Sequence, residues 1–400
     1  MHSRFFRIAL ILGLLSAIGP FAVDMYLPAL PVISRSLGAD MSTTQLSLTA
    51  FFVSLGVGQL VYGPVSDVVG RKPPLYFGLA LFVVASIGCA LATSIDALVA
   101  LRFVQGLGAA AGMVIPRAVV RDLHTGNDAT RLMSLLMLVL GISPILAPLV
   151  GSVVIAHTSW RGVFWAVTFA ALAGLVLAAT MLDESRTRDA RIGGGFGATL
   201  RAYALLLRDG RYLGLVLIGS CAFAIFFIFL ANSPFVLINH YGLSPAHYGM
   251  AFGINAASFF IAAQFNGALC ERFGIERVIK AGAYACGAVL LILLAYYVAI
   301  GDRLWVLIAL YFLASAFMGI VIPTTGVLSL ERHGHIAGTA SALLGTVQIL
   351  TGAVATAVMS GFASDGPLPM VAGMTACGLI AVGLSWVTLG GRSAASVRAI

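Results

Sequence analysis

The chain has 400 residues, of which 60% are hydrophobic and only 10% are charged, and its mean hydropathy is +1.02. A soluble domain carries about 25% charged residues, so this composition excludes an ordinary soluble protein and indicates a polytopic membrane protein. The formal net charge of +8 follows the membrane topology derived below, and it therefore does not call for a nucleic-acid partner.

Apolar windows long enough to cross a membrane recur along the whole chain, because a helix needs about 20 apolar residues to span the hydrocarbon core. The first window follows Arg4 and Arg7 and is longer than the core of a signal peptide, so we expect a retained first span. The twelve predicted spans are residues 8–30, 44–64, 74–94, 97–118, 131–153, 162–182, 212–232, 247–268, 278–298, 304–326, 336–358 and 369–390. The sequence therefore predicts an all-α integral membrane protein.

A long polar interval follows the sixth predicted span and divides the twelve spans six and six. We predict a first six-helix half over residues 1–182, a cytoplasmic basic linker over 183–211 and a second half over 212–400. The linker contains the arginines Arg186, Arg188, Arg191, Arg201, Arg208 and Arg211. Apolar residues recur in it at helical spacing from Phe196 to Leu207, so an amphipathic surface helix and a flexible linker are both open interpretations.

The distribution of Lys and Arg residues predicts how the chain is oriented across the membrane. With the N-terminus inside, nineteen of the 23 Lys and Arg residues fall on the cytoplasmic side, three fall outside, and Arg102 lies within a span. Cytoplasmic loops of membrane proteins carry such an excess, so both termini are predicted to be cytoplasmic.

The loop between the second and third predicted spans reads GPVSDVVGRK, and part of it recurs 204 residues later inside GALCERFGIER. The matched positions are Gly63, Asp67 and Gly70 in the first copy and Gly267, Glu271 and Gly274 in the second. Such a repeat predicts two halves of parallel design, with a substrate site near the membrane midplane between them.

Asp24 is the acidic residue that lies clearly inside a predicted span, and Arg102 is its basic counterpart in the fourth span. A charge at the helix centre costs on the order of 2.5–3.5 kcal/mol, so both residues are functional candidates. At ~1.5 Å per residue, both lie roughly 8–9 Å below the outer edge and could meet. A pairing that changes with substrate or conformation would load and release a proton; a buried ion pair that only fixes helix packing is the alternative.

Further candidates lie in the fourth span itself, in four other spans and near the outer end of the first. Gln105, with Gly106 and Ala109 on the same helical face, suits a cavity or a tight helix contact. Two prolines one turn apart predict a kinked, closely packed fifth span, which includes Pro144, Pro148 and Gly151.

Several polar and aromatic residues are candidates for the walls of a substrate cavity. Those of the second half are Phe227, Asn232, Asn255 and Gln348. Tyr26, near the outer end of the first span, is expected to be an interfacial anchor or to line the mouth of the cavity.

Enzyme motifs are absent from the sequence: there is no GxxxxGK[ST] phosphate loop, no HExxH and no GxSxG. We therefore expect a secondary transporter and not an enzyme, with no metal site and no cofactor, and with a proton gradient as its energy source.

Three motifs carry a family resemblance across the whole chain. GPVSDVVGRK resembles the loop signature of the major facilitator superfamily, and RFVQGLGAA from Arg102 resembles its fourth-span signature. SPILAPLVGS from Ser143 is similar to the fifth-span signature of the drug:proton antiporter branch, with Ala147 and Ser152 where glycines are usual. With DMYLPALP from Asp24, the chain looks most like the Bcr/CflA multidrug efflux group. Val68 departs from the loop signature, where a basic residue is common.

The resemblance implies a fold of twelve transmembrane helices in two pseudo-symmetric six-helix halves that rock against each other. It implies proton-coupled export of small hydrophobic or amphipathic compounds across a bacterial inner membrane. The alternatives are a proton-coupled transporter of an amino acid or sugar with the same fold, and a sensor without transport. We expect a monomer in the lipid bilayer, with a small-molecule substrate and protons as its partners.

The resemblance also implies a cytoplasmic gate. Asp67 would act on the start of the eleventh span near Gly338, and Arg71 would pair with Asp122 at the inner end of the fourth span. Both contacts would hold the cytoplasmic side closed. With the loop glycines, the predicted gate consists of Gly63, Asp67, Gly70, Arg71, Asp122 and Gly338.

Overall fold

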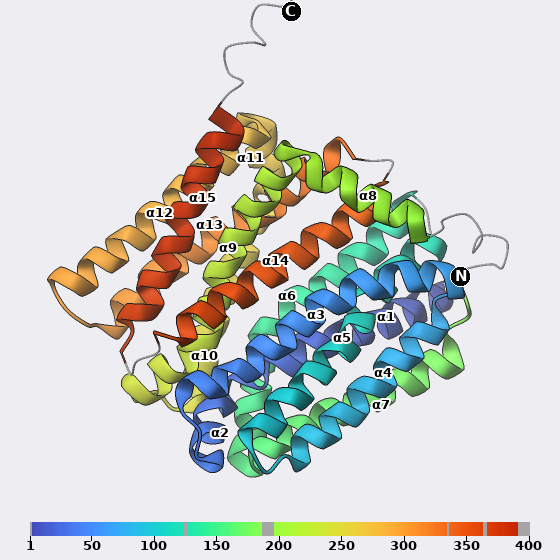
Figure 1. Ribbon diagram of the computed structural model, residues 1–400, viewed down its shortest axis with the longest axis horizontal. Coiled ribbons are helices and arrows are strands. Elements are labelled where there is room, and N and C mark those ends of the chain that lie inside the picture. Colours follow the sequence, from blue (N-terminus) through green and yellow to red (C-terminus); the bar gives the residue numbers. More distant parts are fainter. Residues whose placement is uncertain (1, 124–125, 186–195, 334–335, 363–365, 391–400) are drawn as a thin grey trace, which may run out of the picture. The chain divides into compact units, whose positions relative to one another are not determined.

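The structure is a computed structural model that describes residues 2–123, 126–185, 196–333, 336–362 and 366–390, and every regular element in these ranges is a helix (Figure 1). Clustering of contacts divides the chain into two compact units. The first comprises Met1–Leu200 with Leu243–Gly253, and the second comprises Arg201–Gly242 with Ile254–Ile400. The predicted linker arginines Arg186, Arg188 and Arg191 lie outside the described residues.

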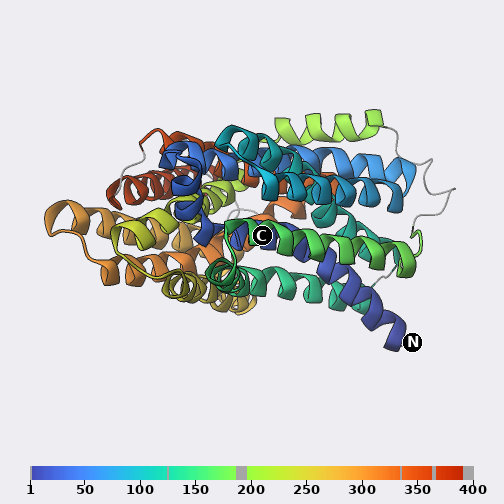
Figure 2. The same cartoon turned by 90° about the horizontal axis from the view of Figure 1, so that it is seen from below.

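The described residues of the first unit contain eight helical elements, of which the six longest run alongside one another (Figures 1 and 2). The eight elements are α1 (His2–Asp24), η1 (Leu27–Ala29), α2 (Leu30–Leu37), α3 (Met41–Val69), α4 (Lys72–Leu91), α5 (Ile95–Leu123), α6 (Gly126–His157) and α7 (Trp160–Met181). Two helices have residues in both units, and these are α8 (Phe196–Arg208) and α10 (Pro245–Gln264). The second unit contains α9 (Gly210–Pro234), the π-helical turn η3 (Phe235–His240), α11 (Asn266–Phe273), α12 (Ile275–Ala299), α13 (Leu304–Glu331), α14 (Ala337–Ser360) and α15 (Leu368–Gly390).

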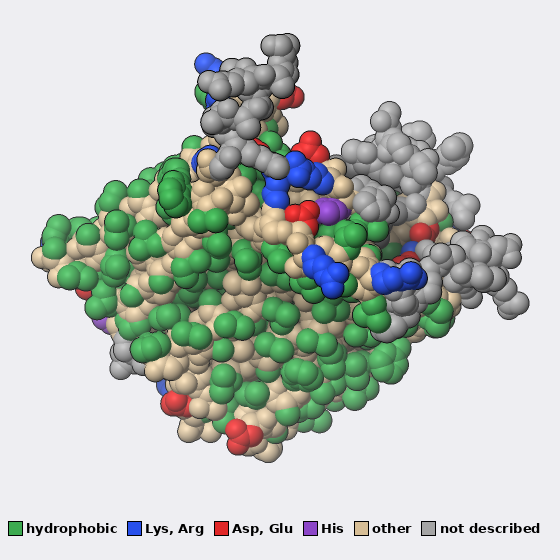
Figure 3. Space-filling view, turned by 45° about the horizontal axis from the view of Figure 1, so that its top comes forward, with side chains coloured by type: hydrophobic (Ala, Val, Ile, Leu, Met, Phe, Trp, Pro, Cys, Tyr) green, Lys and Arg blue, Asp and Glu red, His purple; other side chains and the backbone are tan. Residues whose placement is uncertain are grey.

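Ten of the described helical segments are long and apolar enough to cross a membrane. The other two predicted spans correspond to α6, which contains the apolar stretch Gly141–His157, and to α10. In Figure 3 the charged side chains lie near the upper and lower edges of the face, while hydrophobic side chains, with other side chains and backbone between them, cover its middle. The described residues therefore form a multi-pass membrane protein with ten helical segments of membrane-spanning length, and α6 and α10 lie at the positions of the other two predicted spans.

The internal repeat reappears as a repeated pattern of helix packing. In the first unit, α1 packs against α5, α6 and α7, and α4 packs against α5 and α7. In the second unit, α9 packs against α13, α14 and α15, and α12 packs against α13 and α15. Each pair in the second unit thus corresponds to the pair six spans earlier.

Small residues allow α5 to pack at the centre of the first unit. A Cβ added at Gly106 would lie 2.3 Å from the backbone oxygen of Phe51 in α3, and one added at Gly112 would lie 2.8 Å from that of Leu15 in α1. Glycine lets the helix backbones approach this closely. Ala109 is also buried, so this face of α5 makes a tight helix contact.

The first span differs from the single helix predicted over residues 8–30. Here α1 ends at Asp24, a short 3-10 turn follows, and α2 continues to Leu37. Pro28 and Pro31 cause the interruption, because proline has no backbone N–H to continue the helical hydrogen bonds. The helical path runs seven residues beyond residue 30, from which the depth of Asp24 was counted, so that depth stays a prediction.

The second half of the basic linker forms a helix, α8, and Leu206 of this helix is wholly buried. Leu206 packs with Tyr212 and Val216 of α9 and with Ala340 and Leu343 of α14. Of the two interpretations left open, the helical one therefore holds for residues 196–208, and α8 is anchored on the second unit through protein contacts.

Candidate functional site

Arg102 lies in the first third of α5, and its side chain is wholly buried. Its Nη1 donates to Oε1 of Gln105 at 2.6 Å and to the backbone oxygen of Ala22 at 3.2 Å. Nε and Nη2 have no acceptor among the described residues. The guanidinium therefore reaches α1 at the level of Asp24, two residues after Ala22, and keeps two unused donors.

Two aromatic rings enclose the guanidinium of Arg102. Its Cζ lies 4.3 Å from the ring centroid of Phe51 in α3 and 4.5 Å from that of Tyr26. Such contacts offset part of the cost of burying a cation, because the faces of aromatic rings are electron-rich. Tyr26 also hydrogen-bonds to Ser47 at 2.7 Å and is wholly buried. Because the ring is wholly buried, Tyr26 does not lie at the surface as an interfacial anchor would, and the alternative, that it lines the mouth of the cavity, stays a prediction.

Gln105 positions Arg102. It is wholly buried, and its Nε2 donates to Oγ of Ser86 in α4 at 2.7 Å while its Oε1 accepts from Arg102. Ser86 in turn donates to the backbone oxygen of Phe82. A chain of hydrogen bonds thus fixes the guanidinium between α1 and α4. We predicted Gln105 as a cavity residue; its described contacts are with this network.

Asp24 is the last residue of α1, and only 4% of its surface is exposed. In the described part of the chain, no ion pair joins Asp24 to Arg102. The ion pair between Asp24 and Arg102, which we considered because the two residues lie at similar predicted depths, is therefore absent from this structure. The two residues are at one level, but the guanidinium is turned toward the Tyr26 and Phe51 rings.

The proline-containing helix α6 presses against the turn that follows Asp24. Pro144 and Pro148 lie within one continuous helix. One turn after Pro148, a Cβ added at Gly151 would lie 2.3 Å from the backbone oxygen of Met25. Only glycine permits this contact, which agrees with the close packing predicted for this span. A shift of α6 would therefore act directly on the backbone next to Asp24.

A second polar cluster surrounds Arg71, which follows α3 and whose side chain is 4% exposed. The guanidinium holds Asp122 at the end of α5 with two hydrogen bonds, from Nε at 2.7 Å and from Nη2 at 3.2 Å. Its Nη1 contacts Asp67 at 2.8 Å and donates to Oγ of Ser66 at 2.7 Å. Burial alone would lower the pKa of Arg71, but the charges and hydrogen bonds of Asp122 and Asp67 raise it above its ordinary value. The structure thus joins Arg71 and Asp122.

Two residues that follow α7 complete this cluster, and our reading of the sequence missed both. The carboxylate of Glu184 accepts from the backbone N–H groups of Arg71 at 2.8 Å and Lys72 at 3.1 Å, so it caps the N-terminus of α4. Ser185 donates to Asp122 at 3.1 Å. An acidic pair, Asp183 and Glu184, at the start of an otherwise basic segment was the available signal.

The other predicted gate residues differ in their surroundings, and Gly70 is buried whereas Gly338 is exposed. Gly70 has a φ of +101°, which explains a glycine at the turn between α3 and α4. No atom lies within 4 Å of a Cβ added at Gly63, and the side chain of Asp67 is 48% exposed. Gly338 lies in the first turn of α14, in the second unit, and is exposed. A role for Asp67 at the start of α14 stays a prediction.

The remaining cavity candidates lie on α9, α10 and α14 of the second unit. Phe227 is buried against Gly352, and Nδ2 of Asn232 donates to the backbone oxygen of Ile228 in its own helix at 2.8 Å. Asn255 is buried and Gln348 is half-buried. Their roles as substrate contacts stay a prediction.

A junction at the start of α9 ties the linker to the second unit. Asp209 accepts from the N–H groups of Arg211 and Tyr212, and its other oxygen hydrogen-bonds to Nε2 of His333 at 3.0 Å. Burial raises the pKa of Asp209, but these bonds outweigh it and the net pKa is lowered. Tyr212 donates to the backbone oxygen of Ala340 at 2.7 Å, so the same junction reaches α14.

Known proteins resemble this chain in sequence and in fold. The sequence profile of the Major Facilitator Superfamily matches residues 12–356. The uncharacterized MFS-type transporter YdgK of Bacillus subtilis (strain 168) is 36% identical over 353 residues, which is 87% of each chain. A bicyclomycin resistance protein homolog of Haemophilus influenzae is 29% identical over 388 residues, 94% of each chain. The crystal structure of a D-xylose-proton symporter superposes with a TM-score of 0.74 over 95% of this chain and 97% of that chain, at 17% identity, which shows the fold alone.

Proposed function

The chain belongs to the Major Facilitator Superfamily, and we propose that it exports small hydrophobic or amphipathic compounds in exchange for protons. The transport class follows from the family. The exchange with protons, the outward direction and the drug-like substrates are the proposal, together with a bacterial inner-membrane location, cytoplasmic termini and membership of the Bcr/CflA group.

The observation that carries the proposal is the wholly buried guanidinium of Arg102, which has two donors unused and lies at the level of Asp24. A buried cation without a carboxylate partner is costly, and proteins keep such groups inside membranes mainly for transport or signalling of charge. Asp24 is enclosed on the same level. The pair therefore has the composition of a proton-coupling site.

The coupling step follows from charge balance. When Asp24 is protonated, it is neutral and Arg102 keeps its aromatic partners, as in the arrangement described here. When Asp24 releases its proton, the carboxylate attracts the two unused donors of Arg102, and the end of α1 is drawn toward α5. Because Gly151 of α6 rests on the backbone of Met25, this movement is transmitted to the proline-containing helix.

The energy available is sufficient for efflux. One charge that crosses 100 mV releases about 2.3 kcal/mol, which supports a concentration ratio of roughly 40-fold for each exchanged proton. The proton gradient alone drives the cycle in this proposal, without a cofactor or a bound metal.

The likeness to a bicyclomycin resistance protein homolog over nearly the whole chain supports a drug-like substrate. In this proposal the cluster of Arg71, Asp67 and Asp122 acts as a latch on the cytoplasmic side. Its role is conformational, so Asp67→Asn or Arg71→Ala is expected to slow cycling while leaving substrate affinity nearly intact. A primary loss of equilibrium substrate binding would contradict this role.

The test is accumulation of candidate drugs, amino acids and sugars in cells that express the wild type or Asp24→Asn, with and without an uncoupler. We expect the wild type to lower drug accumulation only while the gradient is intact, and Asp24→Asn to abolish this effect. Asp40→Asn is the matched control, because Asp40 caps α3 through Thr43 and Asn is an equally good cap. Gradient-dependent movement of an amino acid or sugar, with no effect on drugs, would replace the drug proposal.

A further inference from the structure

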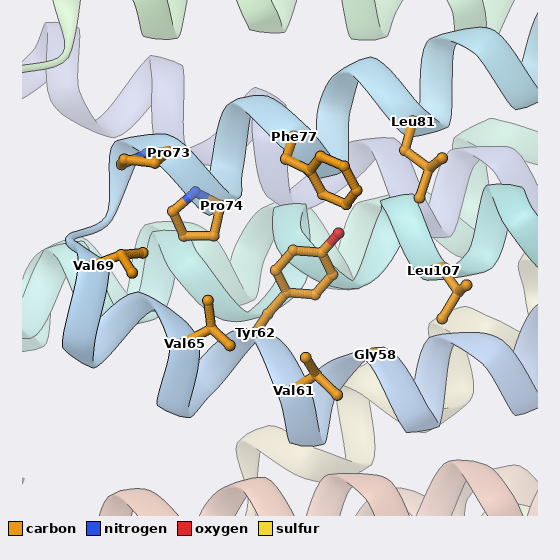
Figure 4. Close-up of a pocket in the computed structure, with 10 residues that line it drawn as sticks. All are labelled: Gly58, Val61, Tyr62, Val65, Val69, Pro73, Pro74, Phe77, Leu81 and Leu107. Carbon is orange, nitrogen blue, oxygen red and sulfur yellow. The ribbon is translucent and has the colours of Figure 1, made fainter. Parts of the chain in front are cut away.

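An apolar groove lies on the first unit between α3 and α4, with α5 as its floor. It has a volume of about 490 Å³. Figure 4 shows Val61 and Val65 of α3 on one side, Phe77 of α4 on the other, and the ring of Tyr62 between the two helices. Its exposed residues are apolar: Val61 is 53% exposed and Phe77 is 64% exposed. Such a groove needs an apolar occupant.

The groove is on the opposite side of α3 from Gly63 and Asp67. Val61, Val65 and Val69 recur every four residues, and Gly63 and Asp67 fall two positions away from them. Two positions correspond to a rotation of about 200° around an α-helix. The groove residues therefore face away from Gly63 and Asp67 on α3.

The length of the groove matches one leaflet of a bilayer. It runs along α3 from Gly58 to Val69, and eleven residues at ~1.5 Å per residue span roughly 16 Å. Half of the ~30 Å hydrocarbon core is about 15 Å. An acyl chain of a phospholipid in the leaflet next to Val69 therefore has the right length, and on the predicted topology that leaflet is the cytoplasmic one.

The side chain of Lys72 lies at the Val69 end of the groove, where the headgroup of a bound phospholipid would lie. Lys72 directly precedes Pro73 in the groove wall, is half-buried, and holds its ammonium 5.6 Å from the ring centroid of Tyr76. Among the described residues it has no ion-pair partner. The N-terminus of α4 offers no competing anion site, because Glu184 already accepts from its first N–H groups and Pro73 and Pro74 have none.

We propose that this groove binds one anionic phospholipid of the cytoplasmic leaflet, with an acyl chain between α3 and α4 and the phosphate at Lys72. In the protein an apolar groove is followed by a single cation. In such a lipid an apolar tail is followed by an anionic headgroup, so the two sequences of groups match. The inference uses the predicted orientation but does not depend on what the protein transports.

The test compares phosphatidylglycerol and phosphatidylcholine with identical acyl chains, titrated onto the purified full-length protein in detergent and followed by native mass spectrometry and by melting temperature. The wild type should bind phosphatidylglycerol more tightly and melt at a higher temperature with it. Lys72→Gln should lower its affinity for phosphatidylglycerol about fivefold, because a basic residue near an anionic lipid contributes about 1 kcal/mol. Lys72→Arg should retain the preference.

Val65→Trp fills the groove and should abolish binding of both lipids. Val84→Trp is the matched control, because Val84 is 67% exposed on α4 and lies outside the groove, so it should bind lipid as the wild type does. Equal affinity of the wild type for the two lipids, or equal effects of Val65→Trp and Val84→Trp, would overturn the proposal. So would a Val65→Trp protein that loses drug binding and keeps the lipid, because the groove would then hold the transported compound.

Discussion

Replacing Arg102 by methionine separates a transport role from a packing role. The change removes a cation that contacts two rings at 4.3 and 4.5 Å and donates two hydrogen bonds. Each cation–π contact is worth about 2 kcal/mol when the cation is desolvated. Against this, burial of the charge costs several kcal/mol, and an apolar side chain of similar size does not incur that cost. The two contributions nearly cancel.

Two acceptors lose their donor in Arg102→Met. Oε1 of Gln105 is left in a buried position, which costs about 1–3 kcal/mol, and the longer bond to the backbone oxygen of Ala22 is worth about 1 kcal/mol. We therefore expect the free energy of unfolding to fall by no more than about 4 kcal/mol. The double variant Arg102→Met with Gln105→Leu removes the stranded acceptor, and Ser86 keeps its bond to Phe82. It should regain about 1–2 kcal/mol relative to the single variant.

The assay measures two quantities for each variant: melting temperature in detergent and gradient-driven transport in vesicles at equal protein amounts. We expect the double variant to recover much of the lost thermal stability while both variants transport at least about tenfold more slowly than the wild type. If transport recovers together with stability in the double variant, Arg102 serves packing alone and the coupling mechanism is refuted.

Three further predictions concern the supporting residues. Glu184→Gln should lower the stability of the first unit by about 1 kcal/mol, since a charged cap on α4 becomes neutral; an unchanged melting temperature would contradict this. Gly151→Ala should destabilise by about 1–3 kcal/mol and impair transport, because the new Cβ meets the backbone of Met25; the control Gly383→Ala, with nothing within 4 Å, should not. Asp209 has a pKa below its ordinary 3.8, so its stabilising effect is present above that value and is lost as the pH falls through the lower folded pKa. The difference in melting temperature between wild type and Asp209→Asn, measured at neutral pH, should therefore shrink steadily as the pH is lowered below 3.8.

Composition and periodicity were sufficient for the span count and the repeat, because hydrophobic length is a property of each segment alone. They did not predict the interruption of the first span after Asp24. Pro28 and Pro31 stand in an apolar run, so hydropathy continues across the break while the hydrogen bonding does not.

Only part of the candidate site could be predicted from the sequence. Counting residues along helices gave the common level of Asp24 and Arg102, but the direction of a side chain around its helix depends on neighbours such as Phe51, which helical counting does not include. Glu184 was missed for a related reason: its contact with Arg71 joins residues 113 positions apart. The groove depends in the same way on three separate helices.

The most direct test of the central claim is transport by the purified protein in proteoliposomes with an imposed pH gradient and no other energy source. We predict that the wild type and Asp40→Asn move a drug against its concentration gradient in exchange for protons, and that Asp24→Asn does not. Proton-coupled accumulation by Asp24→Asn at the wild-type rate would contradict this prediction.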